Sequence, residues 1–94
     1  MVLAVKHRCT FFLEGLDSLK EKRSYVRRAK TILEKEFHCC SCESHSQDDH
    51  ERIGLTLVFL SSSRDHAIGL CQKVNRVLED LLQANLEEEN TEML

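Results

Sequence analysis

The sequence has no proline, no tryptophan and only three glycines, and it lacks a long apolar run. The glycines at 15, 54 and 69 are isolated, so they cannot build a phosphate-cradling loop or a dinucleotide fingerprint. The longest apolar stretch, residues 53–60, is far too short to cross a bilayer. Cations near the N-terminus interrupt the chain before a secretory signal could develop. We therefore expect a soluble, cytoplasmic protein.

A catalytic signature is also missing. No nucleophile is accompanied by an identifiable base, as covalent catalysis would need. His45, Asp48, Asp49 and His50 gather in one polar segment and could serve as acids, bases or ligands, but an exposed hairpin loop has the same composition. We predict no enzyme activity and no cofactor.

Five cysteines are present, and their number and spacing argue against disulfides and metal sites. Strand alternation divides a Cys/His-rich segment between two faces, and its cysteines, in the order Cys39-Cys40-x-Cys42, lie on a predicted strand and not on the turns that space the paired ligands of structural zinc sites. The members of this segment are His38, Cys39, Cys40, Cys42, His45 and His50. We predict no metal site and interpret Cys39, Cys40 and Cys42 as small core residues of a strand. Cys9 and Cys71 are also expected in the core.

The first half of the chain predicts a strand followed by an amphipathic helix. Residues 2–13 alternate between apolar and polar side chains, which is typical of a strand with one buried face. Ser18 predicts a helix N-cap, and Glu21 is placed to complete a capping box by bonding back to the Ser18 amide. Apolar residues then recur at helical spacing to about Phe37.

The second half predicts two strands and a second helix. Residues 38–44 favour a short strand, residues 46–50 a hairpin loop, and residues 52–60 an alternating strand. Serines 61–63 supply the next N-cap, and an apolar helical stripe continues from there to Leu82.

The order strand, helix, strand, strand, helix indicates a ferredoxin-like split βαβ sandwich, with two helices on one face of an antiparallel sheet. We predict this α+β fold for residues 1–84. Residues 85–94 hold four glutamates and little alternation, so we expect an acidic tail or a weak or missing fourth strand. Without that strand, residues 2–13 would form an open sheet edge, which favours a homodimer that covers it.

Several motifs accompany this pattern. Ser18-Leu19-Lys20-Glu21-Lys22-Arg23 follows the first predicted strand, Gln47-Asp48 and Arg52 precede the third, and Arg64 and His66 open the second helix. Over about residues 2–82 the chain resembles the YlxP-like family, small bacterial proteins classed as a domain of unknown function. The resemblance implies a ferredoxin-like fold. It also implies a role near RNA, because genes of that family often lie among those for translation factors and ribosome maturation. Residues 38–42, Cys-rich where that family is usually rich in valine, and the short acidic C-terminus depart from the family pattern.

Charge is distributed unevenly along the chain. Residues 1–37 carry a net +4, and the remainder carries −7. In the first predicted helix, basic residues at i, i+3, i+7 and i+10 form a positive stripe opposite the apolar one, and such a row attracts phosphates. The stripe is Lys20, Arg23, Arg27 and Lys30, flanked by Lys22 and Arg28. Lys6, Arg8 and Phe12 are expected on the sheet face without helices, where RNA-recognition modules stack bases, although the paired aromatics of those modules are absent.

Two functions remain open. The first is a non-enzymatic module that contacts RNA or ribosome-associated factors through these nine residues. The alternative is a dimeric protein–protein interaction module that uses an open sheet edge or face. An ordinary solvated helix face, with pairs such as Lys30 and Glu34, also explains the charge pattern. We expect no membrane partner, and no small-molecule substrate is indicated.

Overall fold

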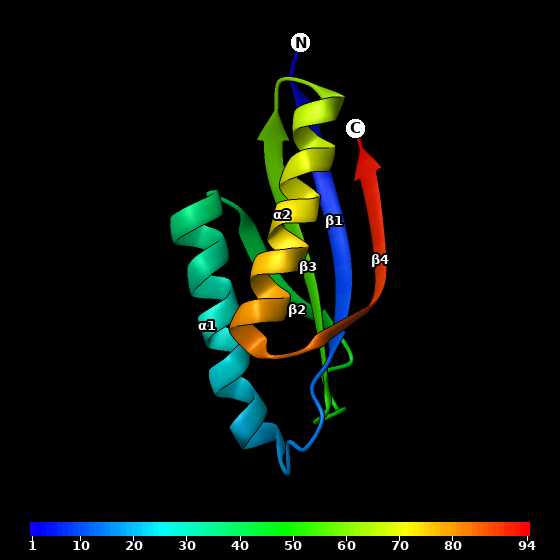
Figure 1. Ribbon diagram of the computed structural model, residues 1–94. Helices are drawn as coiled ribbons and strands as arrows, with labels where there is room; N and C mark the ends of the chain where they lie inside the picture. Colours follow the sequence, from blue (N-terminus) through cyan, green and yellow to red (C-terminus); the bar gives the residue numbers. More distant parts are fainter.

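The computed structural model describes residues 1–94 as two helices packed on one face of a four-stranded sheet (Figure 1). The elements are β1 (Leu3–Phe12), α1 (Leu19–Phe37), β2 (Cys40–His45), β3 (Arg52–Ser61), α2 (Arg64–Leu82) and β4 (Asn85–Met93). The sheet order is β2-β3-β1-β4, and every neighbouring pair is antiparallel. This confirms the predicted α+β architecture. Neither helix is long and apolar enough to cross a membrane.

The core lies between the sheet and the helices. Alternation along β1 turns Val5, Cys9 and Phe11 inward, and alternation along β3 does the same for Leu55 and Leu57. The apolar stripes of α1 and α2 cover them, with Leu33 and Leu78 fully buried. Burying one such large side chain is worth about 1.5–3 kcal/mol, so packing rather than helix propensity holds the helices in place. Cys9 and Cys71 are buried, as predicted.

The prediction of a weak or missing fourth strand is wrong. β4 pairs with β1 from Met93 opposite Val5 to Asn85 opposite Phe12, with a register shift between Thr10 and Phe11. Leu86 and Met93 are seven residues apart, so strict alternation would place them on opposite faces. The shift brings both against the core, which explains why the sequence showed no alternation here.

The position of β4 also changes the edges of the sheet. β1 lies between β3 and β4, so β2 and β4 are the outer strands. The open edge that was expected along residues 2–13 is therefore covered, and with it the reason given for a homodimer disappears.

The burial of the cysteines in and beside the short strand β2 differs from the prediction. Cys39 is buried, but Cys40 and Cys42 are exposed, so the prediction that all three are core residues is wrong. His38 ends α1 in the left-handed conformation, and β2 begins two residues later. Cys40 lies opposite Val58 and Cys42 opposite Thr56, which places both thiols on the face without helices.

A buried polar network connects β1, α2 and β4. His7 is fully buried; its Nδ1 lies 2.8 Å from Thr91 Oγ1 and its Nε2 lies 2.9 Å from Asn75 Oδ1. Asn75 Nδ2 in turn donates to Glu89 at 3.2 Å. These bonds satisfy polar groups that would be costly to bury alone, and they attach β4 to the core.

Candidate nucleic-acid interface

The helix that carries the basic stripe begins at a strong capping residue. Ser18 has extended backbone angles, and its side-chain oxygen accepts the Glu21 N–H at 3.1 Å, as predicted. The Glu21 carboxylate accepts from the Asp17 amide at 3.3 Å instead of the Ser18 amide, so the expected capping box forms one residue earlier. The cap fixes where α1 starts and therefore which residues face outward.

The outer face of α1 is basic and makes no ion pair. Lys20, Arg23, Arg27 and Lys30 are all exposed, opposite the buried Val26, Ala29 and Leu33. Arg28 is exposed as well, with its guanidinium 5.6 Å from the centre of the Tyr25 ring. The ion pairs of the whole chain involve only Lys22 and Arg52 as cations, so none of these five residues forms an ion pair. We call these five residues the α1 basic face.

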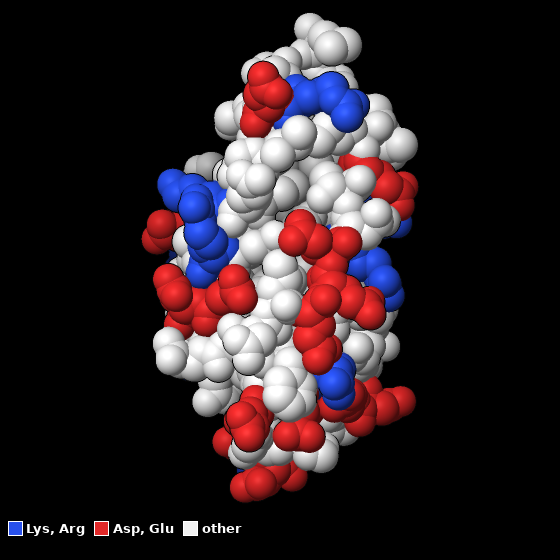
Figure 2. Space-filling view, turned by 45° about the vertical axis from the view of Figure 1, so that its right-hand side comes forward, with Lys and Arg blue, Asp and Glu red and all other residues white.

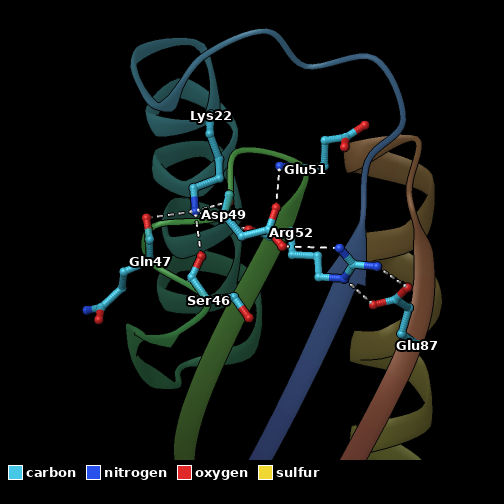
Figure 3. A network of polar contacts seen from close by, with 7 residues as sticks. All are labelled: Lys22, Ser46, Gln47, Asp49, Glu51, Arg52 and Glu87. Carbon is cyan, nitrogen blue, oxygen red and sulfur yellow. Dashed lines mark hydrogen bonds and ion pairs between the residues drawn. The ribbon is translucent and has the colours of Figure 1, made fainter.

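Lys22 does not belong to that face. Its side chain is only 2% exposed, so it cannot contact phosphates, and its inclusion among the candidate residues is wrong. The nitrogen of its ammonium group lies 2.8–3.3 Å from the carbonyl oxygens of Ser46, Gln47, Asp49 and Arg52, which share its three N–H donors (Figure 3). It also pairs with Glu43 Oε2 at 2.9 Å. The lysine therefore anchors the β2–β3 hairpin against α1.

Arg52 organises the other side of the same hairpin. It pairs with Asp49 at 3.1 Å and with Glu87 of β4 at 2.8 Å, while Asp49 also accepts the Glu51 amide at 3.0 Å (Figure 3). The pKa of Asp49 is lowered, first by the hydrogen bond from the Glu51 amide and then by Arg52. The Gln47-Asp48…Arg52 motif thus builds a fixed turn.

The face of the sheet without helices is less suited to nucleic acid than expected. The Arg52 guanidinium lies 5.0 Å from the centre of the Phe12 ring, so one face of this aromatic is already covered. Lys6 and Arg8 are exposed, but Glu92 lies opposite Lys6 on β4. Phe12 therefore lies away from the α1 basic face and beside a strand rich in carboxylates.

A hydrogen-bonded histidine crosses this sheet face. His45 Nε2 lies 2.7 Å from Thr10 Oγ1, and its Nδ1 lies 2.8 Å from Ser44 Oγ. The ring lies against Gly54, where any Cβ would overlap it. Burial and then the charge of Arg8 lower the pKa of His45. The sequence grouped His45 and His50 in one polar segment. The structure separates them, since His50 is exposed at the turn and His45 belongs to the sheet.

The cysteines offer no assembled reactive or metal-binding centre. Burial raises the pKa of Cys9 to about 12 and that of Cys39 to about 11, so both thiols stay protonated. All five cysteines are free, and no three His, Cys, Asp or Glu side chains converge on a point that could hold an ion.

The α1 basic face and the acidic strand β4 lie on opposite sides of the molecule. α1 packs over β2, at one side of the sheet, whereas β4 forms the other side (Figure 1). Glu87, Glu88, Glu89 and Glu92 all lie on β4. Figure 2, in which the right-hand side of Figure 1 comes forward, shows a column of acidic side chains along this part of the surface. The α1 basic face is therefore distant from the acidic strand.

Sequence reasoning missed two features that decide the site. The structural role of Lys22 had one signal, since Lys22 falls four residues before Val26 and so lies near the buried side of the helix. The inward position of His7 could also have been found, because it lies in the buried register of β1 between Val5 and Cys9.

These observations define an α+β protein with two helices on one face of a four-stranded antiparallel sheet and an unpaired basic surface on the first helix. A family model described as "Protein of unknown function (DUF503)" matches residues 5–91, nearly the whole chain. The chain belongs to this family. No curated protein matches it.

Proposed function

We propose that this chain is a small cytoplasmic, non-enzymatic module that contacts RNA, free or within the ribosome, through the α1 basic face. The observation that carries the proposal is that Lys20, Arg23, Arg27, Arg28 and Lys30 are all exposed and form no ion pair. Exposed cations that form no ion pair attract phosphates more strongly than cations paired with carboxylates.

The geometry of α1 suits an extended polyanion. Four of the cations, at positions 20, 23, 27 and 30, span about 15 Å of the helix axis. Small side chains, Ser24 and Thr31, lie beside them and leave room for a backbone to approach. A helix that is capped at Ser18 and packed on the sheet presents these charges without a large ordering cost.

The fold and the sequence resemblance support the same reading. We propose that the fold is ferredoxin-like, because six elements in the order βαββαβ with sheet order β2-β3-β1-β4 have the layered arrangement expected of it. The resemblance of the Ser18–Arg23 motif to the YlxP-like family supports a role near translation. We assign RNA contact to α1 and not to Phe12, which Arg52 partly covers.

The proposal is tested by fluorescence anisotropy with a labelled 20-nucleotide oligouridine and a labelled RNA duplex of the same length. The variant R23Q/R27Q/K30Q removes three charges from the α1 basic face. We expect its Kd to rise at least tenfold for one of the RNAs at low salt, because each phosphate contact contributes through counterion release.

A matched control separates a site from general charge. The variant R64Q/K73Q/R76Q removes three exposed cations from α2 and changes the net charge equally. We expect its Kd to change less than threefold. Equal losses in both variants, or no measurable binding of either RNA by the unmodified protein, would refute an RNA-binding role for α1.

A further inference from the structure

One end of β3 has a neighbouring strand on only one side. β2 begins at Cys40, opposite Val58, whereas β3 continues to Ser61 and pairs with β1 as far as Leu3. Main-chain groups of a strand alternate between its two neighbours, so the segment Phe59–Ser61 turns N–H and C=O groups toward the side that β2 leaves open. The chain cannot extend β2 to cover them, because the Cys39 amide donates to Leu33 of α1 at 3.0 Å. This segment is a short free edge.

A groove of about 720 Å³ lies beside the free edge. It is bounded by the end of α1, the start of β2, the end of β3 and one face of α2. Its apolar wall consists of Phe37, Val58, Phe59, Leu60 and Leu70, and its polar wall consists of Glu36, His38, Cys40, His66 and Lys73. Leu60 is 71% exposed and Val58 44%, so the mouth of the groove is apolar surface in contact with water.

The polar wall favours an acidic occupant. His66, Leu70 and Lys73 occupy one face of α2, and His66 lies in the first turn, where the helix dipole is positive. Ser61 Oγ donates to the Ser63 carbonyl at 2.8 Å, so it must accept from His66 Nδ1, also at 2.8 Å. His66 Nε2 is then the acceptor nitrogen of the neutral ring and has no intramolecular partner, so Lys73 is the cation of this wall. Glu36 is the one carboxylate among the groove residues.

We propose that this groove binds an extended peptide segment of a partner protein, which adds as a strand to the free edge of β3. An apolar side chain of the segment enters the groove between Phe37 and Leu70, and an acidic neighbour faces Lys73. Pairing by backbone hydrogen bonds with a pocket for alternate side chains is an established mode of peptide recognition. The proposal is independent of RNA contact by α1.

The observations favour a peptide over other occupants. A small molecule could fill the apolar part but would not satisfy a row of backbone groups. A second copy, paired through the same edge about a two-fold axis, would bring Lys73 of both copies together, which like charges disfavour. A separate acidic peptide segment can pair with the backbone groups of β3 and brings no second lysine into the groove.

The test is a heteronuclear NMR titration of the ¹⁵N-labelled full chain. The probes are acetylated, amidated pentapeptides with Val, Leu or Phe at the centre and Asp or Glu at the ends. We expect the amide signals of Phe59, Leu60 and Ser61 to shift in a saturable manner. N-methylation of the central peptide bond should weaken binding at least tenfold, because it removes a donor needed for strand pairing.

Two variants test the role of charge. K73E should weaken binding of the acidic pentapeptides at least fivefold, whereas R76E, an equal change on the same helix outside the groove, should leave it unchanged. Four results would each overturn the proposal. They are no shift at Phe59–Ser61 with any probe, equal binding of N-methylated peptides, equal binding of 3-phenylpropionate, and the same shifts when protein concentration alone is raised.

Discussion

At the scale of single residues, Lys22 shows how a basic motif can have a structural purpose. Glu43 Oε2 is buried and accepts no well-formed hydrogen bond, so its compensation is the Lys22 charge at 2.9 Å. Four carbonyls of the hairpin surround the same ammonium group. Within one hexapeptide, therefore, Lys20 and Arg23 face solvent while Lys22 organises the interior.

Replacement of Lys22 by methionine tests this role. We expect K22M to lower the free energy of unfolding by about 3 kcal/mol, because it leaves a largely buried carboxylate and several carbonyls uncompensated. Urea denaturation followed by circular dichroism measures the change. K20M, two residues away on the exposed face, should stay within about 0.5 kcal/mol of the unmodified protein. A similar loss in both variants would contradict a specific anchoring role.

His45 provides a prediction about pH. Its pKa is lowered from the ordinary value of 6.5, first by burial and then by Arg8. The folded protein thus favours the neutral ring, and the unfolded chain binds the proton more readily. The stability contributed by His45 is fully present above about pH 6.5 and is lost as the pH falls through its lower, folded-state pKa.

Two measurements check this prediction. The His45 ring protons, followed by NMR, should titrate below 6.5, and R8Q should move the midpoint upward because it removes a nearby positive charge. H45Q should make the free energy of unfolding less dependent on pH below 6.5. A midpoint at or above 6.5 would show that burial does not disfavour the charged ring.

Residue-level roles were the least predictable part of the site. The sequence correctly predicted that Lys20, Arg23, Arg27 and Lys30 are exposed, because helical spacing alone separates them from the core stripe. It could not predict that Arg52 covers Phe12 or that carbonyls surround Lys22, because both depend on how a distant hairpin folds back. Contacts between segments so far apart have no local periodic signal.

At the scale of the elements, β2 depends on a glycine in its neighbour. A Cβ at Gly54 would overlap both the ring and the backbone oxygen of His45, and backbone cannot move aside as a flexible side chain can. The pairing of β2 and β3 also shifts register between Glu43 and His45, so this point is where the hairpin bends. Gly54 is therefore required for close approach rather than for an unusual backbone angle.

Paired glycine substitutions test this interpretation. We expect G54A to destabilise the protein by about 2 kcal/mol, because overpacking forces a shift of β2 against β3. G69A should instead stabilise it by about 0.5–1 kcal/mol, since Gly69 lies within α2 with nothing near the position of a Cβ. Thermal unfolding of the two variants gives the comparison. An unchanged Tm for G54A would contradict this interpretation, because it would mean that His45 can move away from the added Cβ.

The elements themselves were largely predictable. Capping serines and apolar spacing located both helices, and alternation located β1 and β3. β4 was missed because its apolar residues, Leu86 and Met93, lose period-two spacing at the register shift and because four glutamates lie between or beside them. A strand whose inward positions include Thr91 and Glu89 is stabilised by hydrogen bonds to His7 and Asn75, which hydrophobic patterning does not detect.

At the scale of the whole molecule, the division of charge along the sequence becomes a division across space. α1 lies over the β2 side of the sheet, and the four glutamates of β4 lie on the opposite side. Such an arrangement orients an approaching polyanion toward α1 and repels it from β4. β2 and β4 are three strand spacings apart, about 14 Å. This separation exceeds the screening length of ~8 Å at physiological salt but not that of ~30 Å at 0.01 M, so orientation by β4 is a low-salt effect.

The final prediction uses this difference in range. E88Q/E92Q removes two exposed charges from β4 that make no hydrogen bond or ion pair, whereas E34Q removes one exposed charge beside Lys30 on α1. If RNA binds α1, E88Q/E92Q should improve affinity about twofold at 10 mM salt and have no effect at 150 mM. E34Q should improve affinity at both concentrations, because it acts within a few ångströms of the phosphates. With four phosphate contacts, log Kd for single-stranded RNA should rise with log salt concentration with a slope of about 3. The reverse pattern, with the β4 variant effective at 150 mM and E34Q without effect, would locate the binding surface on the sheet face beside β4.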